Sequence, residues 1–207
     1  MRSDRKMLLV GDSHVVGLAK HFKNLAESAG WTFISYSNVG KSTAWFARQS
    51  VVEQLVKQHA PHVVVIVLGT NDEGAQHNAA NYLKNAEEVI SQAGRAKVLW
   101  ISSPTIPRSE IEDSGAAKRN EILMQNLKVS TADGRALTAD LNALRTPDGV
   151  HFTVQGSKVW AERIFAKTRP LLDSEAVLFS WKRFVVGAAL AVAITASALY
   201  WARLRGA

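Results

Sequence analysis

The sequence contains no cysteine among its 207 residues, and this absence narrows the chemistry that it can perform. Disulfide bonds and thiolate metal sites are excluded, although the absence does not fix the cellular compartment. Four of the histidines also lack the spacing of metal ligands, namely His21, His59, His62 and His77. We therefore expect neither a metal ion nor another cofactor.

The net charge of +7 is not accompanied by a dense block of basic residues. No acid follows Glu175, and four basic residues there leave a charge of only +3 (7 − 4) for the rest of the chain. These four residues are Lys182, Arg183, Arg203 and Arg205. Aromatic residues are not interleaved with the basic ones, so we expect no nucleic-acid partner.

A signal peptide is not visible at the amino terminus, where the apolar run is short and ends at Gly11. The carboxyl end differs, because residues 184–201 carry no charge. As a helix they would be roughly 27 Å long at about 1.5 Å per residue, close to the bilayer's hydrocarbon thickness of about 30 Å. We expect a membrane anchor, with the preceding domain cytoplasmic by default. A helix buried in an oligomer or virion is the alternative.

Apolar runs alternate with helical patterns along residues 1–173. The clearest strand is 62–69, HVVVIVLG, whose β-branched residues on both faces fit a central position. Further strands are expected at 7–10, 31–35, 97–101 and 135–140, and helices at 14–29, 44–58, 81–93, 116–129 and 153–168. This alternation predicts an α/β fold, a flavodoxin-like three-layer α/β/α sandwich around a mostly parallel five-stranded sheet. A linker at 174–183 would join this domain to the hydrophobic helix at 184–201.

Three motifs directly follow predicted strands: GDSH at 11–14, NVGKS at 38–42 and GTND at 69–72. Ligands of such folds bind beyond the carboxyl ends of the strands, so the three motifs should meet in one crevice. The second motif resembles the end of a phosphate-binding loop, G-x-x-x-x-G-K-[ST]. That loop needs a glycine at position 35, where Ser35 stands, and it usually follows the first strand. Nucleotide binding is therefore the weaker interpretation.

The other interpretation is that the motifs together form an active site for acyl transfer. Ser13 lies on a strand-to-helix turn, where negative charge is favoured. Asp148 stands three residues before His151, so its carboxylate can orient the imidazole, which can then take the proton from Ser13. The developing oxyanion needs hydrogen-bond donors, and the amides of Gly40 and Asn71 are placed to supply them.

In this order, GDSH, the lone Gly40, GTND and DGVH at 148–151 resemble the SGNH hydrolases, also called the GDSL family of esterases and lipases. The resemblance covers roughly residues 5–172. It implies a nucleophile, a base and an orienting acid at Ser13, His151 and Asp148. It also implies an oxyanion hole formed by the N–H groups of Ser13 and Gly40 and by Asn71 Nδ2. The family usually has leucine or a similar residue where His14 stands, a departure that leaves this chemistry intact.

The substrate expected from this resemblance is a carboxylic ester of a small molecule, glycan or lipid, and we favour a small acyl group on a carbohydrate. Arg108 lies in the long loop at 103–115 and is a candidate contact for a substrate carboxylate or phosphate. Ordinary structural roles compete with these assignments, since Ser13 could simply cap a helix. A non-catalytic protein of the same fold, in a membrane-attached or viral assembly, is the alternative function. Loss of the nucleophile or base would mark it, and both are present.

Overall fold

The computed structural model describes residues 5–72 and 79–175 of the chain. The predicted hydrophobic helix at 184–201, and all but the first two residues of the predicted linker, lie outside these ranges. Within them, no helix has the length and apolar character that crossing a membrane requires. The membrane anchor therefore stays a prediction from the sequence. Residues up to Arg169 form one compact unit, which contains every predicted site residue.

Five parallel strands form a single sheet in the order β2-β1-β3-β4-β5. The strands are β1 (Lys6–Gly11), β2 (Thr32–Ser37), β3 (Val63–Val67), β4 (Lys97–Ile101) and β5 (Ser130–Ala132). Strand β3 is buried along its whole length, as its β-branched sequence predicts for a central strand. The parallel sheet and the α/β fold class are thus confirmed.

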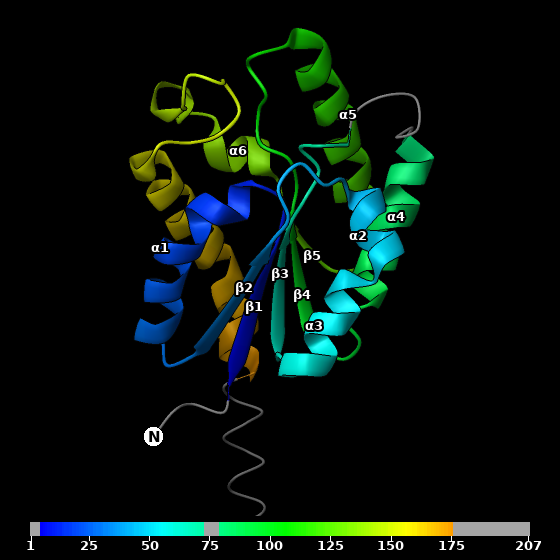
Figure 1. Ribbon diagram of the computed structural model, residues 1–207, viewed down its shortest axis with the longest axis vertical. Coiled ribbons are helices and arrows are strands. Elements are labelled where there is room, and N and C mark those ends of the chain that lie inside the picture. The colour runs from blue at the N-terminus through cyan, green and yellow to red at the C-terminus, as the bar shows by residue number, and fades with distance from the viewer. Residues whose placement is uncertain (1–4, 73–78, 176–207) are drawn as a thin grey trace, which may run out of the picture. The chain divides into compact units, whose positions relative to one another are not determined.

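Helices cover both faces of the sheet, which makes the three layers (Figure 1). Leu8, Val64 and Ile66 share one hydrophobic core with residues of α2 (Thr43–Gln49), α3 (Val51–His59) and α4 (Ala79–Ser91). The opposite face is covered by α1 (His14–Ser28) and by a helix that begins at residue 154. There Phe22 of α1 meets Phe165 edge to face, with ring centroids 5.7 Å apart.

The helix predicted at 44–58 is two helices, α2 and α3, which are separated at Ser50. Ser50 has a φ of 50°, a left-handed conformation that ends the first helix. The prediction of one continuous helix was wrong because the helical pattern of apolar residues runs across this break.

The strand predicted at 135–140 is also wrong. The fifth strand ends earlier, at Ala132, and the short helix α6 (Gly134–Thr138) follows it. Asp133 begins this helix, because its carboxylate accepts a hydrogen bond of 3.0 Å from the Arg135 N–H. Such a side-chain cap favours a helix over an extended continuation of the strand.

Two further helix boundaries differ from the prediction. Helix α5 (Glu110–Asn126) begins six residues before position 116, because the Ser109 hydroxyl caps it by accepting from the Glu112 N–H at 3.3 Å. The last described helix does not end before Pro170 but continues to residue 175, which includes the first two residues of the predicted linker. A proline inside a helix removes one backbone hydrogen bond without necessarily ending it.

Candidate active site

Ser13 lies on the turn between β1 and α1, at the carboxyl edge of the sheet. Strand β1 ends at Gly11, where a Cβ atom would stand 2.0 Å from the Val67 carbonyl oxygen, so no other residue allows β1 and β3 to approach this closely. Ser13 occupies the N-cap position of α1, yet its side chain makes no capping hydrogen bond. The ordinary role of a helix cap therefore does not account for its hydroxyl.

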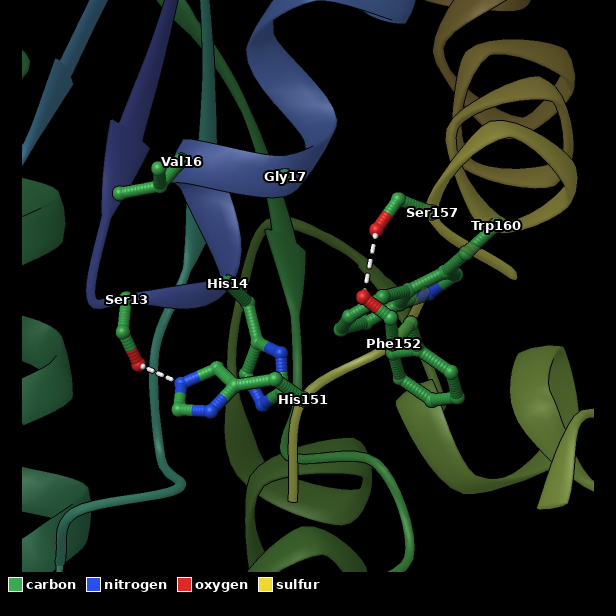
Figure 2. Close-up of a pocket in the computed structure, with 8 residues that line it drawn as sticks. All are labelled: Ser13, His14, Val16, Gly17, His151, Phe152, Ser157 and Trp160. Carbon is green, nitrogen blue, oxygen red and sulfur yellow. Dashed lines mark hydrogen bonds between the residues drawn. The ribbon is translucent and has the colours of Figure 1, made fainter. Parts of the chain in front are cut away.

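The Ser13 hydroxyl instead faces His151, whose Nε2 lies 2.7 Å from Ser13 Oγ (Figure 2). On the other side of the same ring, Nδ1 lies 2.6 Å from Asp148 Oδ2. The structure thus brings the three predicted residues into one hydrogen-bonded chain, although Ser13 and His151 are far apart in the sequence. In this geometry the carboxylate favours a proton on Nδ1 and leaves Nε2 as an acceptor towards Ser13.

The second carboxylate oxygen of Asp148 holds the loop in shape. Oδ1 accepts hydrogen bonds from the N–H of Val150 at 2.8 Å, the N–H of His151 at 3.0 Å and the Thr146 hydroxyl at 2.7 Å. The hydrogen bond to His151, followed by that from Val150, holds the pKa of Asp148 well below its usual range. Asp148 is therefore a carboxylate throughout the neutral pH range.

Arg145 fastens this loop to the segment before α5. Its guanidinium donates to the carbonyl oxygen of Val150 at 2.6 Å and to that of Thr105 at 2.7 Å. It also lies over the Phe152 ring, 4.2 Å from the centroid. Sequence reasoning missed this residue, because its partner Thr105 is 40 positions away and no local pattern connects the two.

Besides Ser13, the residues predicted for the oxyanion hole are Gly40 and Asn71, which lie on the loops after β2 and β3. Gly40 has a φ of 72°, and nothing stands within 4 Å of the position that a Cβ atom would occupy. Asn71 reaches the same loop, because its Nδ2 donates to the Lys41 carbonyl oxygen at 3.3 Å. The neighbouring Asp72 accepts hydrogen bonds from the Thr43 hydroxyl at 2.6 Å and from the Thr43 N–H at 3.1 Å. The loops that follow β2 and β3 are therefore joined by two contacts directly after Gly40, at Lys41 and Thr43.

The residues of the run Gly-Lys-Ser-Thr that follow Gly40 have structural roles in these loops. Ser42 caps α2, since its hydroxyl accepts from the Trp45 N–H at 3.4 Å, and Thr43 is held by Asp72. Lys41 lies over the Trp45 ring, with Nζ 5.6 Å from the centroid. The Ser42 hydroxyl, which a phosphate loop would use to bind a magnesium ion, thus caps a helix instead.

Arg108 lies beside the loop that carries His151. A Cβ atom on Gly149 would stand 3.0 Å from the Arg108 Cβ, which shows how close the two segments come. The Arg108 guanidinium is engaged by Glu112, with Nε 2.7 Å from the carboxylate oxygen. Ile106 of the same segment is buried with Val150 in a small core. The segment therefore adjoins the loop that carries His151, whereas substrate binding by Arg108 stays a prediction.

Two titratable side chains beside Ser13 are buried and were not predicted to matter. Burial raises the pKa of Asp12 to about 7, despite the hydrogen bond that its carboxylate accepts from the His14 N–H. Burial also lowers the pKa of His14 to about 3, and the nearby His151 and Arg145 lower it further. His14 is therefore a neutral imidazole at physiological pH. In the part of the chain that the structure describes, no group of three or more acidic or histidine side chains could hold a metal ion.

Replacement of Asp12 by asparagine should change how stability depends on pH. The folded pKa of about 7 exceeds the unfolded value of about 3.9, so between these values the folded state keeps a proton that the unfolded state has released. The free energy of unfolding contributed by Asp12 therefore falls as pH rises from about 4 to 7, by at most about 1.4 kcal/mol per pH unit.

Asparagine does not titrate, so the stability of Asp12→Asn relative to the wild type should grow across that window and level off above it. Urea denaturation at several pH values measures this difference, and the titration of His14 cancels because both proteins contain it. A difference that stays constant with pH would show that Asp12 does not hold a proton in the folded state.

Comparison with solved structures identifies proteins of the same fold. A lipase/acylhydrolase from Enterococcus faecalis has 23% identity and a TM-score of 0.66, over 80% of this chain and 96% of that one. A family 3 carbohydrate esterase from Clostridium thermocellum has 18% identity and a TM-score of 0.67, over 83% and 98%. A catalytic mutant of an acetylxylan esterase from Geobacillus stearothermophilus has 14% identity and a TM-score of 0.63, over 81% and 95%. No curated protein matches the sequence.

The parallel sheet, its flanking helices and this likeness show that the chain has the fold of the SGNH hydrolases, as its motifs predicted. The chain belongs to the family described as "Protein of unknown function (DUF459)", which matches residues 6–167. At identities below 25% the solved structures share the fold, whereas activity has to be argued from the site itself.

Proposed function

We propose that the protein is a serine esterase that cleaves a carboxylic ester through Ser13, His151 and Asp148. The observation that supports this most is the continuous chain of hydrogen bonds, 2.7 Å from Ser13 Oγ to His151 Nε2 and 2.6 Å from His151 Nδ1 to Asp148 Oδ2. It lies at the carboxyl edge of a parallel sheet, where ligands of such folds bind. Esterases are also among the proteins that share this fold.

In the proposed reaction His151 Nε2 takes the proton of Ser13 as the serine oxygen attacks the ester carbonyl carbon. The carbonyl π electrons move to its oxygen, and the Asp148 carboxylate stabilises the imidazolium that forms. His151 then gives its proton to the alcohol oxygen as the ester bond breaks, which leaves an acyl group on Ser13. Water attacks this acyl-enzyme with His151 again as base, and the carboxylic acid leaves as Ser13 is regenerated.

The oxyanion formed in both steps would be held by the N–H groups of Ser13 and Gly40 and by Asn71 Nδ2. An amide nitrogen carries two N–H donors, and Asn71 uses one of them to bind the Lys41 carbonyl oxygen. This hydrogen bond fixes the orientation of the side chain, and the second N–H is left for the oxyanion. A donor that is held in place before the reaction stabilises the developing charge at little cost in reorganisation.

As substrate we favour a small acyl group, such as acetyl, on a carbohydrate. The fold is shared with an acetylxylan esterase and a family 3 carbohydrate esterase, which supports this choice, but it is also shared with a lipase/acylhydrolase, so the acyl length has to be tested. The alternative is a non-catalytic scaffold. It is the weaker proposal, because Ser13, His151 and Asp148 lie within hydrogen-bonding distance of one another.

A series of p-nitrophenyl esters, from acetate to long-chain acyl groups, tests this proposal. We expect measurable hydrolysis, with the highest kcat/KM for the acetate ester, because the acyl group of the proposed natural substrate is small. The release of p-nitrophenol reports both activity and acyl length. A preference for long chains would contradict the choice of substrate, and a protein that hydrolyses none of the esters would favour the scaffold.

Two alanine variants separate the oxyanion hole from a phosphate loop. Asn71→Ala should lower kcat on the order of 10²–10³, the usual loss of one oxyanion donor. Lys41→Ala should have little effect on an uncharged ester, because its ammonium lies over Trp45. A phosphate loop predicts the reverse, with the lysine required. Calorimetric titration of the wild type with ATP and magnesium completes the comparison, and tight binding would overturn the esterase proposal.

A further inference from the structure

Arg145 lies at the start of the loop that carries His151. It pairs with Phe152 as an isolated antiparallel bridge, so the two ends of the loop are tied to each other. Its guanidinium also lies over the Phe152 ring, 4.2 Å from the centroid, and this residue lines the pocket beside Ser13 that His14 also lines (Figure 2). The loop is therefore closed on itself, and its position relative to Ser13 depends on what fastens it to the rest of the domain.

Two contacts hold the peptide group that joins Val150 to His151. On one side, Arg145 Nη1 donates to the Val150 carbonyl oxygen at 2.6 Å. On the other side, the His151 N–H donates to Asp148 Oδ1 at 3.0 Å. A peptide group is planar, so holding both its oxygen and its nitrogen keeps the plane from rotating. The orientation of the imidazole that follows this peptide group therefore depends on Arg145 as well as on Asp148.

The same guanidinium reaches the segment before α5. Arg145 Nη2 donates to the carbonyl oxygen and to the hydroxyl oxygen of Thr105, at 2.7 Å each. This segment is itself firmly held, because the N–H of the next residue, Ile106, donates to Asp113 Oδ1 at 2.6 Å. Asp113 lies on α5 and binds Arg135 of α6 through both carboxylate oxygens, at 2.6 and 2.7 Å. Thr105 is therefore a fixed point of the domain, to which Arg145 fastens the loop.

The guanidinium of Arg145 makes these contacts without a carboxylate. In the part of the chain that the structure describes, the acceptors of its hydrogen bonds are all neutral oxygens, those of Val150 and Thr105 and, at 3.3 Å, Asn142 Oδ1. Burial lowers the pKa of Arg145, because it disfavours the charged form. What this arginine supplies is a planar fork of donors that binds two segments at once, and a lysine ammonium does not reproduce it.

We propose that Arg145 is a positioning residue of the active site, which keeps the imidazole of His151 within reach of Ser13 by holding the preceding peptide group against Thr105. This inference rests on the proposed esterase function. His151 has to take a proton from Ser13 Oγ, 2.7 Å from its Nε2, and then deliver it to the alcohol oxygen. Both transfers need hydrogen-bonding distance, and a displacement of about 1 Å can lower the rate about 10²-fold.

Arg145→Ala should lower kcat for p-nitrophenyl acetate roughly 10²-fold, with KM close to the wild-type value, because Arg145 acts through the base. Guanidine at millimolar concentration, far below the concentrations that denature proteins, should restore part of the loss. Arg163→Ala is the matched control, since Arg163 also donates to a carbonyl oxygen of another element, that of Leu137 at 2.9 Å, but outside the site. This control should keep the wild-type rate with and without guanidine.

The leaving group distinguishes a displaced His151 from a general loss of folded protein. Phenyl acetate and p-nitrophenyl acetate have similar shapes, but phenolate is the poorer leaving group and gains more from the proton that His151 delivers. In Arg145→Ala, kcat/KM should therefore fall more for phenyl acetate. Endpoint labelling with a fluorophosphonate counts the molecules with a reactive Ser13, and rates are expressed per labelled molecule. Arg145→Lys, which keeps the charge but not the fork, should show the same difference with a smaller loss.

The outcomes separate this inference from the proposed function. A wild-type kcat in folded Arg145→Ala overturns the positioning role while the esterase stands. If Arg145→Ala does not fold, a wild-type kcat in Arg145→Lys overturns it in the same way. A loss that is equal for the two phenyl esters assigns Arg145 a structural role and also overturns the inference. If the wild type hydrolyses neither ester, nor any other p-nitrophenyl ester, the esterase proposal itself fails and the role of Arg145 with it.

Discussion

The Ser13→Ala variant is expected to lose ester hydrolysis by a factor on the order of 10⁴–10⁶ in kcat. The substitution removes the one oxygen that attacks the substrate, and His151 then has no hydroxyl from which to take a proton. The fold should remain, because Ser13 Oγ makes no capping bond to α1 and the residue that it contacts is His151, which belongs to the same site. Steady-state kinetics and thermal unfolding of the same preparations measure both effects.

A matched control distinguishes this loss from a general effect of removing a serine hydroxyl. Ser91 lies at the end of α4, where its hydroxyl donates to the Glu88 carbonyl oxygen at 2.8 Å on the surface. Ser91→Ala should keep the wild-type rate. A serine-directed fluorophosphonate should label the wild type and Ser91→Ala but not Ser13→Ala. Labelling that persists in Ser13→Ala would rule out Ser13 as the nucleophile.

Most of the candidate site could be read from short motifs. Ser13, Gly40 and Asn71 each follow a strand, and a parallel sheet brings the carboxyl ends of its strands to one edge. Asp148 and His151 are three positions apart on one loop, so their contact is local. The one contact of the triad between residues far apart in the sequence joins His151 to Ser13, and it follows from the topology of the fold.

What the motifs could not reveal depends on partners that are remote in the chain. Arg145 carries no local signal, because its role follows from Thr105 and from the Val150 carbonyl oxygen. His14 could be recognised only as a departure from the family pattern. Its burial and its place in a pocket depend on Phe152 and Trp160, which the fold brings to it from the far end of the domain.

The errors in secondary structure have a common physical origin in side-chain and backbone details within a single turn. The pattern of apolar residues runs across Ser50, so periodicity alone does not reveal a serine with a φ of 50°. Similarly, Asp133 caps α6 through one hydrogen bond to the Arg135 N–H, and this contact outweighs the weak strand pattern that follows it. Neither detail moves the site, because the strands that carry it were predicted within a few residues.

The Asp148→Asn variant should lower kcat by roughly 10³–10⁴ without unfolding the protein. In the wild type the carboxylate accepts a hydrogen bond from His151 Nδ1, which keeps Nε2 free to accept the proton of Ser13. Asparagine can present its NH₂ group to Nδ1 instead, because its own Oδ1 is needed by the N–H groups of Val150 and His151. The imidazole then carries its proton on Nε2, which is the wrong tautomer for a base towards Ser13.

The pH profile and a second variant complete this test. The pKa of Asp148 is held well below its usual range, so protonation of this carboxylate should cause no loss of wild-type kcat/KM in mild acid. Asp140 is a matched control, since its carboxylate also pairs with a basic side chain, Arg163, but outside the site. Asp140→Asn should keep the rate. A rate in Asp148→Asn close to that of the wild type would show that another group orients the base, because the geometry leaves asparagine no means of selecting the reactive tautomer.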